Sequence, residues 1–157
     1  MTVSPEEVLD EARAKGWTIA TAESCTGGML SAALTDVPGA SDVFSGAVVS
    51  YSNEVKIGLL KVRPTTLTEH GAVSQAVARQ MAAGVYEQTG ARLTIAITGI
   101  AGPGGSGHKP EGRVCFAVAS PDFSHAETVE FGAIGRQNVR QGAVDRALDL
   151  LMMAMTQ

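Results

Sequence analysis

Aromatic side chains are scarce in this chain of 157 residues, where they make up 4% of the total, and charged side chains make up only 18%. The core must therefore be built mostly from Ala, Val, Leu, Ile and Met. Cysteine is also scarce, since Cys25 and Cys115 are the only two, and their separation does not match a metal-binding motif. This composition excludes a disulfide-stabilised scaffold, a disordered chain and a coiled coil.

The chain also lacks an excess of positive charge. Its formal net charge is −4 at pH 7, whereas a protein dedicated to nucleic acid needs a basic face to neutralise phosphates. Its first residues are acidic and lack the apolar segment of a secretory signal, and its apolar runs are far shorter than the ~20 residues of a membrane span. We expect a single domain over residues 1–157 that is cytoplasmic and has neither a nucleic acid nor a membrane as partner.

Glycine is abundant, with 18 residues, and it separates segments whose apolar spacing predicts strands and helices. Strands that alternate with helices, followed by a hairpin and a last helix, indicate an α/β fold, a three-layer α/β/α sandwich. We expect a mixed, mainly parallel sheet with one antiparallel strand from the hairpin. The predicted strands span residues 17–22, 44–51, 93–98, 113–120 and 126–131, and the predicted helices start at Ser4-Pro5 or span 28–34, 52–60, 74–89 and 136–155.

Small and polar residues follow three of the predicted strands. These clusters span residues 23–28, 51–56 and 98–105. In open α/β sheets, ligands bind at the carboxyl ends of the parallel strands. A strand-to-helix turn can carry glycines and hydroxyls for purely structural reasons, but three such clusters on one edge of one sheet predict a binding or catalytic site.

The first cluster contains two candidate nucleophiles, Ser24 and Cys25. A hydroxyl at a strand-to-helix junction lies beside free backbone N–H groups, which can stabilise a phosphate or a developing oxyanion. Ser24 is therefore the favoured nucleophile, with donors from Thr26 and Gly27, while Gly28 also lets a ligand approach the backbone. Cys25 is interpreted first as a small buried residue.

A serine nucleophile needs a base, and Lys56 is the best placed candidate, one helical turn beyond the second strand end. At its reference pKa a lysine is almost fully charged near neutral pH, so burial or a nearby cation must lower its pKa. Tyr51 could relay a proton or simply pack at the strand end. The possible cations are Arg113, Arg136 and Arg140, and none of the histidines, His70, His108 and His125, has a clearly site-like context.

The third cluster leads into a Gly-rich loop, in which residues 102–107 formally match G-x-G-x-x-G. A strand rather than a helix follows this loop, which argues against dinucleotide binding. Successive backbone N–H groups with Lys109 could instead form a phosphate cradle. Arg136 and Arg140 share a helix face and are either surface charges or part of the same anion pocket.

These residues match a known family. The segments are Thr21-Ala22-Glu23-Ser24-Cys25-Thr26-Gly27-Gly28, Tyr51-Ser52-Asn53-Glu54, His70-Gly71-Ala72-Val73-Ser74 and Gly99-Ile100-Ala101-Gly102-Pro103. In this order, over residues 5–152, the chain resembles the CinA C-terminal domain family, which includes the nicotinamide-nucleotide amidohydrolases. The resemblance implies a three-layer α/β/α fold and hydrolysis of the carboxamide of nicotinamide mononucleotide to nicotinic acid mononucleotide and ammonia, in pyridine nucleotide salvage. It implies no cofactor and no metal, a homo-oligomer and the stand-alone form of the domain.

The resemblance also implies roles for individual residues. Ser24 resembles the nucleophile and Lys56 its base, with Tyr51 nearby, and Thr26 and Gly27 match the turn around the reacting carbonyl. Thr98, Gly99, Lys109 and Arg140 match ligand-binding positions. From their places in the first and third clusters, Gly28 and Gly102 are also expected to bind the substrate. Glu111 departs from the family, which commonly has an apolar residue there. Two other readings are kept: Cys25 as nucleophile with Glu23 and Lys56, and a mononucleotide-binding module without catalysis.

Overall fold

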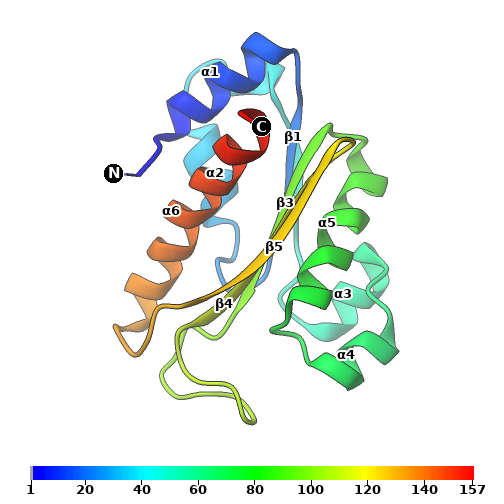
Figure 1. Cartoon of the computed structure of the whole chain (residues 1–157), viewed down its shortest axis with the longest axis vertical. Helices are drawn as coiled ribbons and strands as arrows, with labels where there is room; N and C mark the ends of the chain where they lie inside the picture. The colour runs from blue at the N-terminus through cyan, green and yellow to red at the C-terminus, as the bar shows by residue number, and fades with distance from the viewer. Residues whose placement is uncertain (1) are drawn as a thin grey trace.

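The computed structural model describes residues 2–157 as a five-stranded sheet covered by helices on both faces (Figure 1). Helices α1, α2 and α6 lie on one face, and α3, α4 and α5 lie on the other. The strands are β1 (Ile19–Glu23), β2 (Phe44–Val49), β3 (Leu93–Gly99), β4 (Arg113–Ser120) and β5 (Phe123–Glu130). The helices are α1 (Pro5–Lys15), α2 (Met29–Thr35), α3 (Asn53–Leu60), α4 (Pro64–His70), α5 (Gln75–Thr89) and α6 (Arg136–Met155), with a 3₁₀ turn at Ala40–Asp42.

The strand order is β2-β1-β3-β4-β5. Strand β1 pairs in parallel with both β2 and β3, whereas β4 is antiparallel to β3 and to β5. Four strands therefore share one direction and β4 alone opposes them. This arrangement confirms the predicted three-layer sandwich with a mixed, mainly parallel sheet.

The predicted last strand was wrong at its start. It was expected to begin at residue 126, but β5 begins at Phe123, because Ser120 pairs directly with Phe123 and leaves a turn of only Pro121 and Asp122. Helix α4 was not predicted at all. Its sequence is rich in threonine, a weak helix former, and Gln80 of α5 supports it by accepting from the Arg63 N–H and donating to the Thr66 hydroxyl.

The core is aliphatic on both faces of the sheet. Phe116 is the only aromatic among the largest fully buried side chains of the described residues, and the face under α5 is lined mainly by alanine and valine. These small side chains let α5 and α3 come close: a Cβ atom on Gly84 would lie 2.0 Å from the carbonyl oxygen of Leu60. This close contact fixes α3, which begins directly after β2, at the edge of the sheet.

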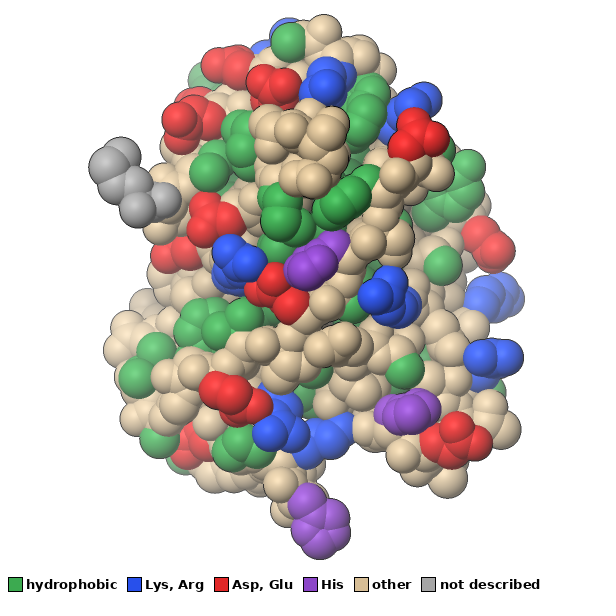
Figure 2. Space-filling view, in the orientation of Figure 1, with side chains coloured by type: hydrophobic (Ala, Val, Ile, Leu, Met, Phe, Trp, Pro, Cys, Tyr) green, Lys and Arg blue, Asp and Glu red, His purple; other side chains and the backbone are tan. Residues whose placement is uncertain are grey.

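No helix within residues 2–157 is both long and apolar enough to cross a lipid bilayer. On the face drawn in Figure 2, Lys and Arg side chains are scattered among acidic ones and form no continuous stripe.

Candidate functional site

The carboxyl ends of β1, β2 and β3 meet at one edge of the sheet, beside a cavity of about 320 Å³. All three of the predicted polar clusters contribute to its wall. Ser24 and Cys25 come from the first, Tyr51, Asn53 and Lys56 from the second, and Thr98 with residues 99–104 from the third. These three segments therefore lie together at one cavity, as expected from their positions at the carboxyl ends of parallel strands.

Ser24 and Lys56 are in direct contact in this cavity. The Lys56 Nζ atom donates to Ser24 Oγ at 3.0 Å, and it also donates to the backbone carbonyls of Ser50 at 2.9 Å and Tyr51 at 3.1 Å. Lys56 is only 1% exposed and is among the largest fully buried side chains of the described residues. A buried amine held on a serine hydroxyl has the geometry of a nucleophile and its base.

The contact follows from local structure. Parallel pairing of β1 with β2 continues beyond the strands, since the Ser50 N–H donates to the Glu23 carbonyl at 2.8 Å. Helix α3 then begins at once, capped by Ser52, whose hydroxyl accepts from the Val55 N–H at 3.2 Å. Lys56 lies in the first turn of this helix, so its side chain reaches back to the ends of both strands.

Burial lowers the pKa of Lys56 below its ordinary value of 10.5, with a smaller opposing effect from Cys25. The arginines considered from the sequence as the depressing cation are not the cause. Arg113 is paired with Glu130 at 2.6 Å, and Arg136 and Arg140 donate to oxygen atoms of the site wall instead. The cause is desolvation of the ammonium by the surrounding protein, which shifts the equilibrium toward the neutral amine.

Glu23 holds the turn that follows Ser24. Its buried carboxylate accepts from the Thr26 hydroxyl at 2.7 Å, from the Leu30 N–H at 3.0 Å and from the Ser31 N–H at 2.9 Å. These last two donors lie in the first turn of α2, where backbone N–H groups lack helical partners and an acidic group is favoured. Glu23 thus caps the first turn of α2, and its carboxylate is not free to act as the partner of a Cys25 nucleophile.

Cys25 is buried beside the cavity, and burial raises the pKa of its thiol to about 11. A thiol must be ionised to act as a nucleophile, so this environment makes Cys25 inert. It instead packs tightly: a Cβ atom on Gly99 would lie 3.0 Å from the Cys25 sulfur and 2.8 Å from Val114. Gly99 is therefore needed for close approach of β3 to this turn.

Tyr51 and Arg136 lie together at the cavity. Tyr51 is 60% exposed, and its hydroxyl accepts from Arg136 Nη2 at 2.9 Å, while Arg136 Nη1 donates to the Gly102 carbonyl at 2.7 Å. The phenol thus contacts Arg136, while Lys56 contacts only the backbone carbonyl of Tyr51. Within residues 2–157, no carboxylate lies within 4.0 Å of Arg136. Its positive charge is available to an anion.

Some predicted ligand-binding residues do not line the cavity but form hydrogen bonds with the turn that does. Arg140 donates to the carbonyls of Cys25 at 3.0 Å and Thr26 at 3.2 Å, and the Gly27 N–H donates to the Ser24 carbonyl at 3.0 Å. These bonds fix the shape of the turn after the serine. The predicted residues outside the lining of the cavity, among those described, are Thr26, Gly27, Gly28, Lys109 and Arg140.

The Gly-rich loop is tied down at two points. Lys109 Nζ donates to the carbonyls of His70 and Val73, so its charge is directed at the segment before α5. Glu111, which departs from the family pattern, accepts from the Gly104 N–H at 2.7 Å. Gly102 has a φ of +93°, and a Cβ there would lie 2.6 Å from the Glu111 carboxylate, so only glycine fits.

Thr98 lines the cavity, and its hydroxyl donates to the Ala72 carbonyl at 2.8 Å. This bond holds the segment before α5 against the end of β3, which brings Ala72 and Val73 into the wall. Sequence reasoning did not assign these two residues or the Ser50 carbonyl to the site. Backbone carbonyls and small apolar side chains carry no chemical signal, although the position of Ser50 at a strand end could have pointed to it.

Comparison with known proteins identifies this chain by family. The model of the CinA C-terminal domain matches residues 2–155. The chain belongs to the CinA C-terminal domain family. It is 49% identical over 146 residues to a CinA-like protein of Prochlorococcus marinus and 48% identical over 140 residues to one of Mycobacterium marinum, covering 92% and 88% of this chain. It spans only about a third of the length of these curated relatives, 34% and 33%.

Solved CinA-superfamily structures share the whole fold. The competence/damage inducible protein CihA from Agrobacterium tumefaciens superposes with a TM-score of 0.88 at 38% identity, covering 100% of both chains. The competence damage-inducible protein A from Klebsiella pneumoniae gives a TM-score of 0.92 at 35% identity, covering 99% of both chains. The CinA family includes amidohydrolase members.

Proposed function

We propose that this CinA-family chain is a serine amidohydrolase that converts nicotinamide mononucleotide and water to nicotinic acid mononucleotide and ammonia, with no metal ion in the reaction. The observation that carries the proposal is the buried contact of 3.0 Å between Lys56 Nζ and Ser24 Oγ. The family resemblance supplies the substrate, and the geometry supplies the reacting groups.

The three partners of Lys56 suit a neutral amine. Such an amine has two N–H donors and one lone pair. The carbonyls of Ser50 and Tyr51 can only accept, so they take the two N–H groups and direct the lone pair at the Ser24 hydroxyl. In this state the Ser24 O–H donates to Lys56 Nζ, which is the arrangement that general-base catalysis requires.

Each step can be written on these atoms. Ser24 Oγ attacks the carboxamide carbon while Lys56 Nζ takes the hydroxyl proton, and the carbonyl oxygen becomes an oxyanion. Lys56 then donates its proton to the carboxamide nitrogen, the C–N bond breaks, and ammonia leaves an ester on Ser24. Water attacks this ester as Lys56 accepts a proton from it. The bond to Ser24 Oγ then breaks while Lys56 returns this proton to Oγ, so nicotinic acid mononucleotide is released with the Ser24 hydroxyl and the neutral Lys56 amine restored.

The family resemblance, rather than the lining of the cavity, assigns the oxyanion to backbone donors of the turn after Ser24, since Thr26 and Gly27 lie outside that lining. The Thr26 N–H donates to no other group among residues 2–157, whereas the Gly27 N–H is taken by the Ser24 carbonyl. Fixed donors of this kind are worth about 10²–10³ in rate each. Thr26 therefore contributes through its backbone, and its side chain, bound to Glu23, keeps that backbone in place.

The proposed function is tested by incubating the chain with nicotinamide mononucleotide in the presence of a chelator and separating the products. We expect equal amounts of nicotinic acid mononucleotide and ammonia. A mononucleotide-binding module without catalysis would instead show saturable binding, seen as a thermal shift, with no product after long incubation. That result would overturn the proposal.

The pH dependence of the reaction should report Lys56. The neutral amine is the active form, and burial lowers the pKa of Lys56 below 10.5, so kcat/KM should rise with pH and level off below that value. The profile is measured on the free-enzyme parameter kcat/KM across neutral and alkaline pH. A rate that falls as pH rises from neutral would contradict Lys56 as the base.

Arg136 should bind the phosphate of the substrate. A hydrogen bond to a charged group contributes about 1.5–3 kcal/mol, so Arg136→Gln should raise KM about 10- to 100-fold with little change in kcat. Steady-state kinetics separate the two parameters. Arg63→Gln, which removes an exposed arginine outside this cavity, serves as the matched control, and equal KM values for the two variants would show that Arg136 does not hold the substrate.

A further inference from the structure

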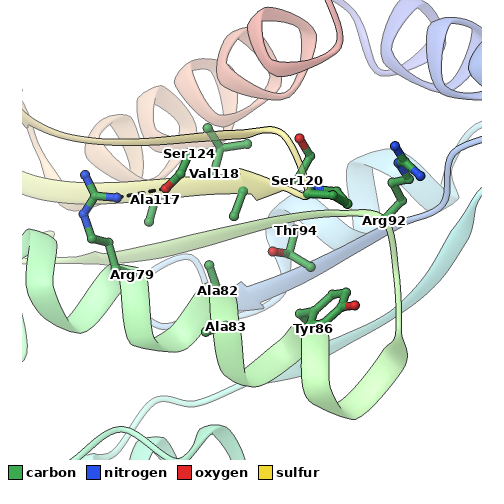
Figure 3. A pocket seen from close by; sticks show the side chains of 12 residues that line it. Arg79, Ala82, Ala83, Tyr86, Arg92, Thr94, Ala117, Val118, Ser120 and Ser124 are labelled. Carbon is green, nitrogen blue, oxygen red and sulfur yellow. Dashed lines mark hydrogen bonds between the residues drawn. The ribbon is translucent and has the colours of Figure 1, made fainter.

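A second cavity, of about 480 Å³, lies at the opposite end of the sheet between α5 and strands β3, β4 and β5 (Figure 3). It exists because both walls are built from small side chains. Ala82 and Ala83 face it from α5, and Ala117 and Ala119 face it from β4. Alanines cannot fill the space between a helix and a sheet, so an apolar hollow remains beside the hairpin.

One face of α5 borders this cavity with a distinctive sequence. Arg79, Ala82, Ala83 and Tyr86 follow the i, i+3, i+4, i+7 spacing of a helix face. Tyr86, one of the two tyrosines in the chain, is 51% exposed. Tyr86 therefore presents an aromatic side chain next to the apolar floor, as Tyr51 does at the candidate active site.

The cavity is bordered by positive charge. Arg79 and Arg92 lie at opposite ends of it in Figure 3, and no acidic residue is among its lining residues within the described chain. Arg92 is partly engaged, since it stacks over the Trp17 ring at 5.1 Å and lies 3.8 Å from Asp122. Arg79 Nη1 donates to the Ser124 hydroxyl at 2.9 Å, and no carboxylate of residues 2–157 lies within 4.0 Å of Arg79.

We propose that this cavity binds a small amphipathic organic anion, an aromatic carboxylate, independently of the Ser24 site. The ring lies on the alanine floor beside Tyr86, and the carboxylate pairs with Arg79, whose planar guanidinium suits it. The volume falls in the range of small-molecule sites, which are mostly apolar with a few placed polar groups. Because the lining carries positive charge and no negative charge, an anion fits better than a cation or a neutral ring.

The experiment uses 2-naphthoate as the probe and the neutral 2-naphthamide for comparison, titrated into the full chain by calorimetry. We expect saturable binding of 2-naphthoate, weakened about tenfold or more by Arg79→Gln. The affinity for 2-naphthamide should be weaker than for 2-naphthoate and should be the same in wild type and Arg79→Gln. Ala83→Leu, at an exposed helix position where leucine is also a good helix former, should fill the cavity and abolish binding.

Two controls place the bound probe. Arg63→Gln removes an arginine outside the cavity, and Arg136→Gln removes the cation of the Ser24 site. Both should leave the affinity for 2-naphthoate unchanged. The proposal is overturned if 2-naphthoate does not bind at millimolar concentration, if Arg136→Gln rather than Arg79→Gln weakens it, or if a correctly folded Ala83→Leu variant binds as wild type does. None of these readouts depends on turnover of nicotinamide mononucleotide.

Discussion

Ser24→Ala is expected to lower kcat for hydrolysis of nicotinamide mononucleotide by about 10⁴-fold or more, the size of loss seen when a serine nucleophile is removed. Among residues 2–157, Ser24 Oγ is the only side-chain oxygen that Lys56 Nζ contacts. Without it no hydroxyl is in place to attack the carboxamide carbon. The backbone donors and Arg136 remain, so the variant should still bind substrate.

The measurement is kcat by ammonia release, with substrate affinity measured in parallel by calorimetry. Ser45→Ala is the matched control, because Ser45 is exposed on β2 and lies outside the cavity. It should turn over like wild type. If Ser24→Ala bound substrate normally and kept more than about a tenth of wild-type kcat, covalent catalysis by Ser24 would be wrong, since a true nucleophile costs far more.

Lys56→Met is expected to lower kcat by about 10²–10⁴-fold, the range of general-base contributions. Methionine has a similar length and suits a buried position, but it cannot take the proton of Ser24. Lys56→Arg should be equally inactive, because a guanidinium stays protonated and cannot act as a base. Both variants together separate the loss of positive charge from the loss of a titratable amine.

The control for these variants is Lys61→Met, which removes an exposed lysine at the end of the same helix. It should retain wild-type kcat. Lys56→Met should also lose the alkaline rise in activity, so any residual rate should be independent of pH over that range. A Lys56→Met variant with wild-type turnover and pH profile would assign the base to another group.

The pH dependence of stability provides a separate check on Lys56. Its pKa in the folded chain is lowered by burial, whereas the unfolded chain keeps the ordinary value of 10.5. Between these two values the unfolded state binds more protons, so Lys56 makes the free energy of unfolding rise with pH there. Deprotonation of Lys56 should therefore increase both the catalytic rate and the free energy of unfolding as the pH rises.

The sequence allowed the meeting of Ser24 and Lys56 to be predicted because it depends on topology. A strand that ends at Ser24 and a neighbouring strand that ends near Tyr51 bring their following turns together if the strands are parallel. The pairing of β1 with β2 fulfils this condition. The burial of Lys56 could not be predicted, because it depends on two backbone carbonyls and on the packing of α3 against α5.

The roles of the lysine and arginine side chains near the site were also hard to predict, because they too depend on contacts with backbone carbonyls. Arg140 and Lys109 donate hydrogen bonds to backbone carbonyls. These contacts depend on the path of loops, which sequence periodicity does not describe. Arg136, four residues before Arg140 on α6, reaches the cavity wall instead. Helix α4 was missed because its threonine-rich sequence has little helical propensity, and contacts with Gln80 stabilise it.

The central claim is that Ser24, and not the adjacent Cys25, attacks the substrate with Lys56 as its base. The most direct test measures turnover of nicotinamide mononucleotide by Ser24→Ala and Cys25→Ala side by side with wild type. The account predicts that product formation is lost in Ser24→Ala and kept in Cys25→Ala, because the Cys25 thiol has a pKa of about 11 and is buried. Loss of turnover in a folded Cys25→Ala variant, with turnover kept in Ser24→Ala, would contradict it.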